Sequence, residues 1–172
     1  MRRTLALLAL GLLAACAPQK KAQVEADLSK QLSPGCYTVD LFDPYRLEYP
    51  EAGVSPKDLG FLGVWQNGAW DGDWCHDLYI TRVSADGSVE LLDAYGPSAR
   101  FGHEATVYRR KGRISDGVLT FISHKQTPVS YRLVGDYLVG QRKGLFGVID
   151  ITMSRTDRVA VVPVPPRKPV RS

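Results

Sequence analysis

Residues 67–77 gather side chains that could bind a metal ion. The segment reads NGAWDGDWCHD, with Asp71, Asp73, His76 and Asp77 close together. Carboxylates on a flexible loop can surround a hard cation such as Ca²⁺, but the further ligands that an EF-type loop needs at fixed spacing are missing. Asp and Gly are also strong turn formers. We therefore interpret the segment as the loop of the first hairpin and predict no metal site.

Two histidines lie beside residues that could assist acyl transfer. Glu104 follows His103, and His124 follows Ser123, a possible nucleophile. The sequence lacks both a Gly-x-Ser-x-Gly elbow and a Ser-x-x-Lys motif with a Lys-Thr-Gly partner. We expect these histidines to be solvated near strand ends, and we predict no catalytic residue, no enzyme activity and no cofactor.

A run of basic residues, YRRKGR, occupies positions 108–113. Successive side chains of a strand point to opposite faces, so Arg109, Lys111 and Arg113 would share one face. That face could bind anionic lipid headgroups or glycans. A solvated outer face is the alternative.

The first sixteen residues, MRRTLALLALGLLAAC, have the organisation of a secretion signal. Two arginines precede an apolar run that is too short to cross a bilayer, which needs about 20 residues. The sequence from Leu13 to Cys16, LAAC, resembles the lipobox of bacterial lipoproteins. The resemblance implies that Cys16 becomes the acylated first residue of the mature chain, anchored in a membrane. In lipoproteins of enteric bacteria, an aspartate directly after the acylated cysteine retains the protein in the inner membrane. Ala17 occupies that position here, which favours the outer membrane. We expect the protein to face the periplasm.

Lipidation of Cys16 leaves Cys36 and Cys75 as a pair. An even number of cysteines in an oxidising envelope compartment predicts a disulfide. A redox-active or catalytic thiol is the alternative, but the sequence has no Cys-x-x-Cys motif.

The chain has 172 residues, which is long enough for one domain, and its formal net charge is +4. The excess of basic residues lies in the signal and in the proline-rich tail, so the remainder is slightly acidic. No basic stripe with interleaved aromatics is present, and we predict no nucleic-acid partner. The predicted divisions are a signal peptide (1–15), a lipidated N-terminus with a tether (16–35), a Pro- and aromatic-rich arm (36–58), a barrel (59–155) and a Pro- and Arg-rich tail (156–172).

Val24, Leu28 and Leu32 in the tether are four residues apart, which would suit a short amphipathic helix, but we favour a solvated linker. The prolines of the arm exclude a helix or a central strand. We expect the arm to pack on the barrel, because it also carries aromatic residues.

Eight short runs of β-type residues follow, each ended by a turn containing Gly, Asp or Pro. They span residues 60–66, 77–84, 88–95, 106–114, 118–123, 129–134, 137–143 and 146–153. No connector is long enough for a crossover helix, so neighbouring strands should be antiparallel. The pattern predicts an all-β, eight-stranded, up-and-down barrel, since closure removes exposed edges, with a β-sandwich as the alternative.

Gly63 and Trp65 form a Gly-x-Trp motif in the first run, and Arg155 follows the last. This combination resembles lipocalins and other calycins, in which a terminal basic residue lies across the tryptophan. Segments 60–65, 77–80, 85–87 and 113–121 are also similar to an uncharacterised bacterial barrel domain. The resemblance implies barrel closure at Gly63, Trp65 and Arg155, and binding of a small apolar ligand or an envelope partner. The alternative is an accessory lipoprotein whose barrel is filled and binds no ligand.

Overall fold

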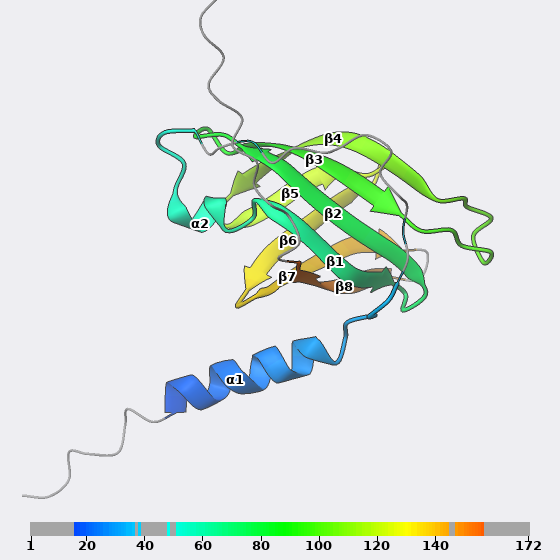
Figure 1. Cartoon of the computed structure of the whole chain (residues 1–172), viewed down its shortest axis with the longest axis horizontal. Helices are drawn as coiled ribbons and strands as arrows, with labels where there is room; N and C mark the ends of the chain where they lie inside the picture. Colours follow the sequence, from blue (N-terminus) through cyan, green and yellow to red (C-terminus); the bar gives the residue numbers. More distant parts are fainter. Residues whose placement is uncertain (1–15, 37, 39–47, 49–50, 145–146, 157–172) are drawn as a thin grey trace, which may run out of the picture.

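The computed structural model describes residues 16–36, 38, 48, 51–144 and 147–156. Eight antiparallel strands, each paired with the next, close into one barrel (Figure 1). The strands are β1 (Gly63–Trp70), β2 (Trp74–Val83), β3 (Ser88–Tyr95), β4 (Thr106–Ser115), β5 (Val118–Ile122), β6 (Pro128–Val134), β7 (Tyr137–Gly144) and β8 (Gly147–Arg155). The predicted fold class is confirmed, and the sandwich alternative is wrong.

The barrel closes where β1 pairs with β8. Trp65 lies opposite Arg155 and Gln66 opposite Ser154. The Thr156 N–H extends the seam by donating a 3.0 Å hydrogen bond to the Val64 carbonyl. Among the described strands, this pairing means that neither the first nor the last is a free edge strand, which is the physical advantage of closure for an eight-stranded meander.

The first hairpin differs from the prediction. Residues 67–77 are not a long loop, because β1 continues to Trp70 and β2 starts at Trp74, and these two residues pair. Only three residues turn, with positive φ at Asp71 (54°) and Gly72 (75°). Aspartate and glycine tolerate this left-handed backbone, so the turn formers were recognised correctly but the turn is tight. The remaining side chains of the segment therefore belong to strands.

Among the described residues, two short helices precede the barrel. Helix α1 (Cys16–Ser29) occupies most of the predicted tether, so the expected solvated linker is wrong there. Ion pairs one turn apart, Lys21 with Glu25 and Lys30 with Asp27, stabilise it, as such pairs do in exposed helices. Within the described part of the chain, neither helix has the length and apolar character needed to cross a membrane.

Helix α2 (Pro56–Leu59) is a single turn at the end of the predicted arm, where the prolines were expected to exclude a helix, and it continues one residue into the predicted barrel. Pro56 stands at the first helical positions, where a missing N–H costs nothing. Ser55 caps the turn, its Oγ accepting a 3.1 Å hydrogen bond from the Asp58 N–H. Proline therefore starts this helix instead of preventing it.

Four described residues of the arm contact β2 on its outer face. Cys36 forms a disulfide with Cys75, which confirms the predicted pair. The Thr38 hydroxyl, which is buried, donates a 2.7 Å hydrogen bond to Asp77 Oδ2. Further along, the Glu48 N–H donates to the Thr81 carbonyl, and Glu51 pairs with Arg82.

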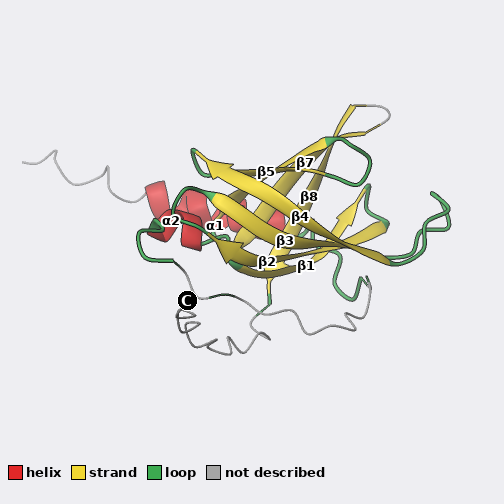
Figure 2. Ribbon diagram, turned by 90° about the horizontal axis from the view of Figure 1, so that it is seen from above, coloured by secondary structure: helices red, strands yellow, loops and turns green. Residues whose placement is uncertain are grey.

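The barrel interior is filled by its own side chains. Residues that alternate along the strands point inward, and the largest of them have less than 2 % of their surface exposed. These are Trp65, Trp70, Trp74, Tyr95, Tyr131, Leu78, Ile80, Leu91, Leu119, Leu138 and Met153, with Phe61 just before β1. Gly140 makes room for the Tyr131 ring, which a Cβ at that position would overlap. Figure 2 shows from above the strands that form the barrel wall.

Candidate functional site

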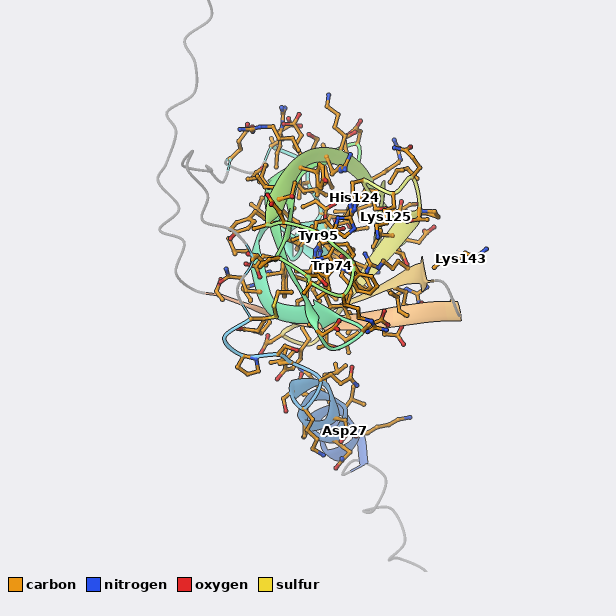
Figure 3. The ribbon with its side chains drawn as sticks, turned by 90° about the vertical axis from the view of Figure 1, so that its right-hand side faces the viewer. Asp27, Trp74, Tyr95, His124, Lys125 and Lys143 are labelled. Carbon is orange, nitrogen blue, oxygen red and sulfur yellow. A yellow bond between two sulfur atoms is a disulfide. The ribbon has the colours of Figure 1, made fainter. Side chains whose placement is uncertain are left out.

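The two ends of the barrel carry different chemistry. Helix α2 lies at one end, and the β1–β2 turn and the β3–β4 loop lie at the other (Figure 1). We call these the α2 end and the mouth. Figure 3 views the molecule from the side of the mouth, where Trp74, Tyr95, His124 and Lys125 gather within the ring of strands.

At the α2 end, Trp65 and Arg155 form a cation–π pair. The Arg155 Cζ lies 4.4 Å from the Trp65 ring centroid. The Trp65 Nε1–H donates a 2.9 Å hydrogen bond to the Phe61 carbonyl. The guanidinium donates to the carbonyls of Leu62, at 2.6 Å, and Gly60.

Gly63 is needed at this end for a steric reason. A Cβ there would lie 2.6 Å from Arg155 Nη1, and its φ of 134° disfavours any other residue. The three residues that sequence analysis assigned to closure therefore lie together. Their polar groups are hydrogen-bonded within the protein, so this contact closes the barrel and has a structural role.

The mouth holds a mixed group of aromatic and titratable side chains, which we call the mouth cluster. Its members converge from strands β1 to β4, β7 and the β5–β6 turn. They are Trp70, Trp74, His76, Asp93, Tyr95, Tyr108, Arg110, His124, Lys125 and Arg142, with Tyr131 of β6 beneath them.

A buried polar trio lies deepest in the cluster. His76 Nε2 is 3.0 Å from the Tyr131 hydroxyl and 3.7 Å from Asp93 Oδ1, and the side chains of His76 and Asp93 are 0 % exposed. Burial, assisted by the positive charge of Arg142, lowers the pKa of His76 to about 3, so the ring is neutral at physiological pH. Burial raises the pKa of Asp93 to about 7, although Tyr95, Arg110 and Arg142 act in the opposite direction.

Three cations approach the same place from separate elements. The Arg142 guanidinium lies 4.3 Å from the centroid of the Trp70 ring and 5.0 Å from that of Trp74. Lys125 Nζ lies 4.9 Å from the same Trp74 ring. The Arg110 guanidinium lies over Tyr108, with its Nε 3.7 Å from Asp93 Oδ2. Burial and the charge of Arg142 lower the pKa of Lys125, which shows that the two cations oppose each other.

Several polar atoms of the mouth cluster are buried without a hydrogen bond of standard geometry among the described residues. They are Trp70 Nε1, His76 Nδ1, both Asp93 carboxylate oxygens, Arg110 Nε and His124 Nδ1. Arg82 Nε is also without one, but it lies on the outer face, 3.5 Å from Glu48 Oε2. An unpaired buried polar group costs on the order of 1–3 kcal/mol. The concentration of such groups at the mouth marks it as the candidate site.

The residues considered for a metal are separated by the strand pleat. His76 points into the barrel, whereas Asp77 lies on the outer face, bonded to Thr38. Asp73 pairs with Arg100 at 3.4 Å. Across the described ranges, no group of three or more His, Cys, Asp or Glu side chains could hold a metal ion.

The residues considered for acyl transfer are also not arranged for it. The Ser123 hydroxyl bonds to the Thr127 hydroxyl at 2.8 Å. The expectation that the histidines are solvated is wrong, because both lie half-buried against aromatic rings. His124 stacks on Tyr108 at 4.9 Å, and His103 stacks on Trp74 at 5.1 Å. Burial, with nearby cations, lowers the pKa of His124 to about 4.

The basic run divides between the two faces of β4. Arg109, Lys111 and Arg113 are exposed on the outer face, and binding there stays a prediction. Arg110 and Tyr108 point the other way, toward the mouth cluster. Arg110 was not among the residues predicted from the sequence, although the same alternation that grouped its neighbours also assigns it to the inner face with Ile114, which is buried.

The predicted signal peptide, lipidation site and tail lie at the two ends of the chain. The signal peptide (1–15) and residues 157–172 of the tail lie outside the described residues, and Cys16 is the first residue of α1. No family model, no curated protein and no solved structure matches the chain.

Proposed function

We propose that the protein is a lipid-anchored, non-catalytic lipoprotein of the bacterial envelope that binds at the rim of its barrel and not inside it. The observation that carries the proposal is the filled interior. A lipocalin-like apolar ligand would have to displace Trp70, Trp74 and Tyr131, each of which is at most 2 % exposed. A filled barrel is therefore favoured over a ligand in the barrel, while binding at the rim is kept from the first hypothesis.

Two cavities lined by described residues support binding outside the barrel. One, of about 310 Å³, lies between α1 and the β6–β7 turn, lined by Lys20, Lys21, Val24, Glu25, Val134 and Gly135. Another, of about 540 Å³, lies on the outer face, beside the β2–β3 turn and Lys111 of β4. Of the core residues, only Val89 lines either cavity, and none of the core aromatic residues does.

The lipid anchor at Cys16 suits the position of α1. The helix has 14 residues, a length of about 21 Å at 1.5 Å per residue. Its C-terminal extension reaches the barrel, where the Ser33 N–H donates to the Asn67 carbonyl at 2.7 Å and Thr152 donates to Gln31. Acyl chains on Cys16 would therefore hold the barrel at the membrane by a helical stalk.

The anchor can be tested by metabolic labelling of the full chain with palmitate. We expect the wild type to be labelled and to fractionate with the outer membrane, and Cys16→Ser to lose the label. Ala17→Ser is the matched control and should keep it. Persistent labelling of Cys16→Ser would contradict the proposed anchor.

The filled barrel is tested by native mass spectrometry of the protein purified from its host envelope. We expect no stoichiometric apolar molecule to accompany the chain. An apolar molecule that is retained, and that is lost on organic extraction with a fall in stability, would contradict the proposal and restore the ligand-in-barrel hypothesis.

A further inference from the structure

Positive charge exceeds negative charge at the mouth. Arg110, Lys125 and Arg142 converge there from β4, the β5–β6 turn and β7. Asp93 is the carboxylate that faces them from inside the barrel, and it is too deeply buried to remain fully ionised near neutral pH. In the adjacent turn, Asp71 interacts with Arg142 only through space, and Asp73 is paired with Arg100.

Buried N–H groups without a standard hydrogen bond lie in the same region. Among the described residues, Trp70 Nε1 and Arg110 Nε make no hydrogen bond of standard geometry, although Arg110 Nε lies 3.7 Å from Asp93 Oδ2. Trp70 lies under Arg142, while His124 stacks on Tyr108, over which Arg110 lies. His124 Nδ1 is also unpaired, and in one of its two neutral tautomers it is a further donor. The donors and the cations therefore belong to one region of the cluster.

The shape of the cluster limits what could occupy it. The Trp74 ring is contacted by His103, Lys125 and Arg142, and it is 2 % exposed, so it offers no free face on which a ring-shaped ligand could stack. Lys125 is exposed and Arg142 half-buried, so charge is accessible at the rim. A small group rich in hydrogen-bond acceptors would satisfy both the cations and the unpaired donors.

We propose that the mouth cluster binds a small oxyanion, a phosphate or carboxylate group, between Arg110, Lys125 and Arg142. The inference deepens the proposed binding at the rim and does not depend on the lipid anchor. A free anion and the phosphate of a lipid headgroup share this chemistry, and the two sources are separated by the test.

The test is calorimetric titration of the full chain, in neutral detergent, with inorganic phosphate and with citrate at constant ionic strength. We expect saturable binding of at least one anion. Arg110→Gln and Arg142→Gln should each weaken it roughly tenfold or more, because each removes a charge-assisted hydrogen bond. Lys125→Gln should weaken it less, because this side chain is exposed.

Two matched controls come from the same strands. Arg109 neighbours Arg110 on β4, Lys143 neighbours Arg142 on β7, and both point outward. Figure 3 shows Lys143 projecting away from the mouth. Arg109→Gln and Lys143→Gln should leave the affinity within about twofold, as expected for screened surface charges.

Two results of the titration would overturn the proposal. Absence of saturable binding by the wild type, with the unpaired groups satisfied by water alone, would overturn the proposal. So would equal losses in the outward-facing controls, since they would indicate unspecific charge attraction. If Arg110→Gln fails to fold by circular dichroism, Arg142→Gln and Lys125→Gln carry the test.

The source of the anion is decided with vesicles. Phosphatidylcholine vesicles with and without phosphatidylglycerol are compared for binding of the same variants. Binding to anionic vesicles that Arg142→Gln weakens and Lys143→Gln does not would indicate a headgroup. Saturable phosphate or citrate binding without such vesicle binding would indicate a free anion.

Discussion

The α2 end and the mouth use the same pair of side chains, a tryptophan beneath an arginine, in opposite ways. At the α2 end, Arg155 covers Trp65, and both donate to backbone carbonyls of residues 60–62. At the mouth, Arg142 covers Trp70, whose Nε1–H has no acceptor among the described residues. A closed set of hydrogen bonds stabilises a fold, whereas unpaired groups impose a cost that a ligand can offset. This difference distinguishes a structural contact at the α2 end from a candidate binding site at the mouth.

The largest expected effect comes from removing the closing contact at the α2 end. Trp65→Ala should lower the free energy of unfolding by about 3–5 kcal/mol, because it removes a fully buried aromatic and leaves a cavity. Urea unfolding followed by circular dichroism measures the change. A loss of unfolding free energy below about 1 kcal/mol would show that this end of the barrel repacks to fill the cavity and that Trp65 is not important for closure.

The next prediction concerns the carboxyl at the mouth. Asp93 has an ordinary pKa of 3.8 when unfolded and about 7 when buried, so between these values the folded protein binds the extra proton. Its contribution to the free energy of unfolding therefore falls as the pH rises from about 4 to 7. The wild type should lose on the order of 2–4 kcal/mol relative to Asp93→Asn across this range.

Comparison with Asp93→Asn isolates this titration. His76 acts in the opposite direction, because its lowered pKa of about 3 makes the unfolded chain the better proton acceptor up to about pH 6.5. Since both proteins contain His76, its contribution largely cancels in the difference. A difference that stays constant with pH would mean that Asp93 is ionised in the folded state throughout.

A smaller effect measures the contact between Arg155 and Trp65. Arg155→Ala should cost less than Trp65→Ala, and a double-mutant cycle should give a coupling of about 0.5–2 kcal/mol, the range of a cation–π pair. Zero coupling would show that Arg155 acts only through its hydrogen bonds to the backbone carbonyls.

The smallest effect compares the two indole N–H groups directly. Trp65→Phe and Trp70→Phe remove the same atoms, but only the first breaks a hydrogen bond, that to the Phe61 carbonyl. Trp65→Phe should therefore be more destabilising by about 1 kcal/mol in urea unfolding. Equal losses would mean that the Trp70 N–H has a partner in solution, such as an ordered water.

The sequence could predict the parts of the barrel that depend on local patterns. Alternating apolar residues and Asp-Gly turns indicated eight antiparallel strands, and the even cysteine count indicated the pairing of Cys36 with Cys75. These features depend on neighbours along the chain, or on simple counting. The same local reasoning was wrong for 67–77 and for α1, because turn formers mark where a turn lies but not how long it is, and because helix and linker compete closely over short exposed segments.

Only the tertiary structure decided which side chains meet at the mouth. His76, Asp93, Arg110 and Arg142 come from four different strands and are separated by up to 66 positions in the sequence. Their convergence depends on the register of every intervening strand pair, because a slip by one residue would turn a side chain to the opposite face. Burial then sets their protonation, since the charge on Asp93 and His76 depends on the surrounding core and not on the residue type. Alternation along a strand is a property of the chain, whereas convergence across a closed barrel is a property of the fold.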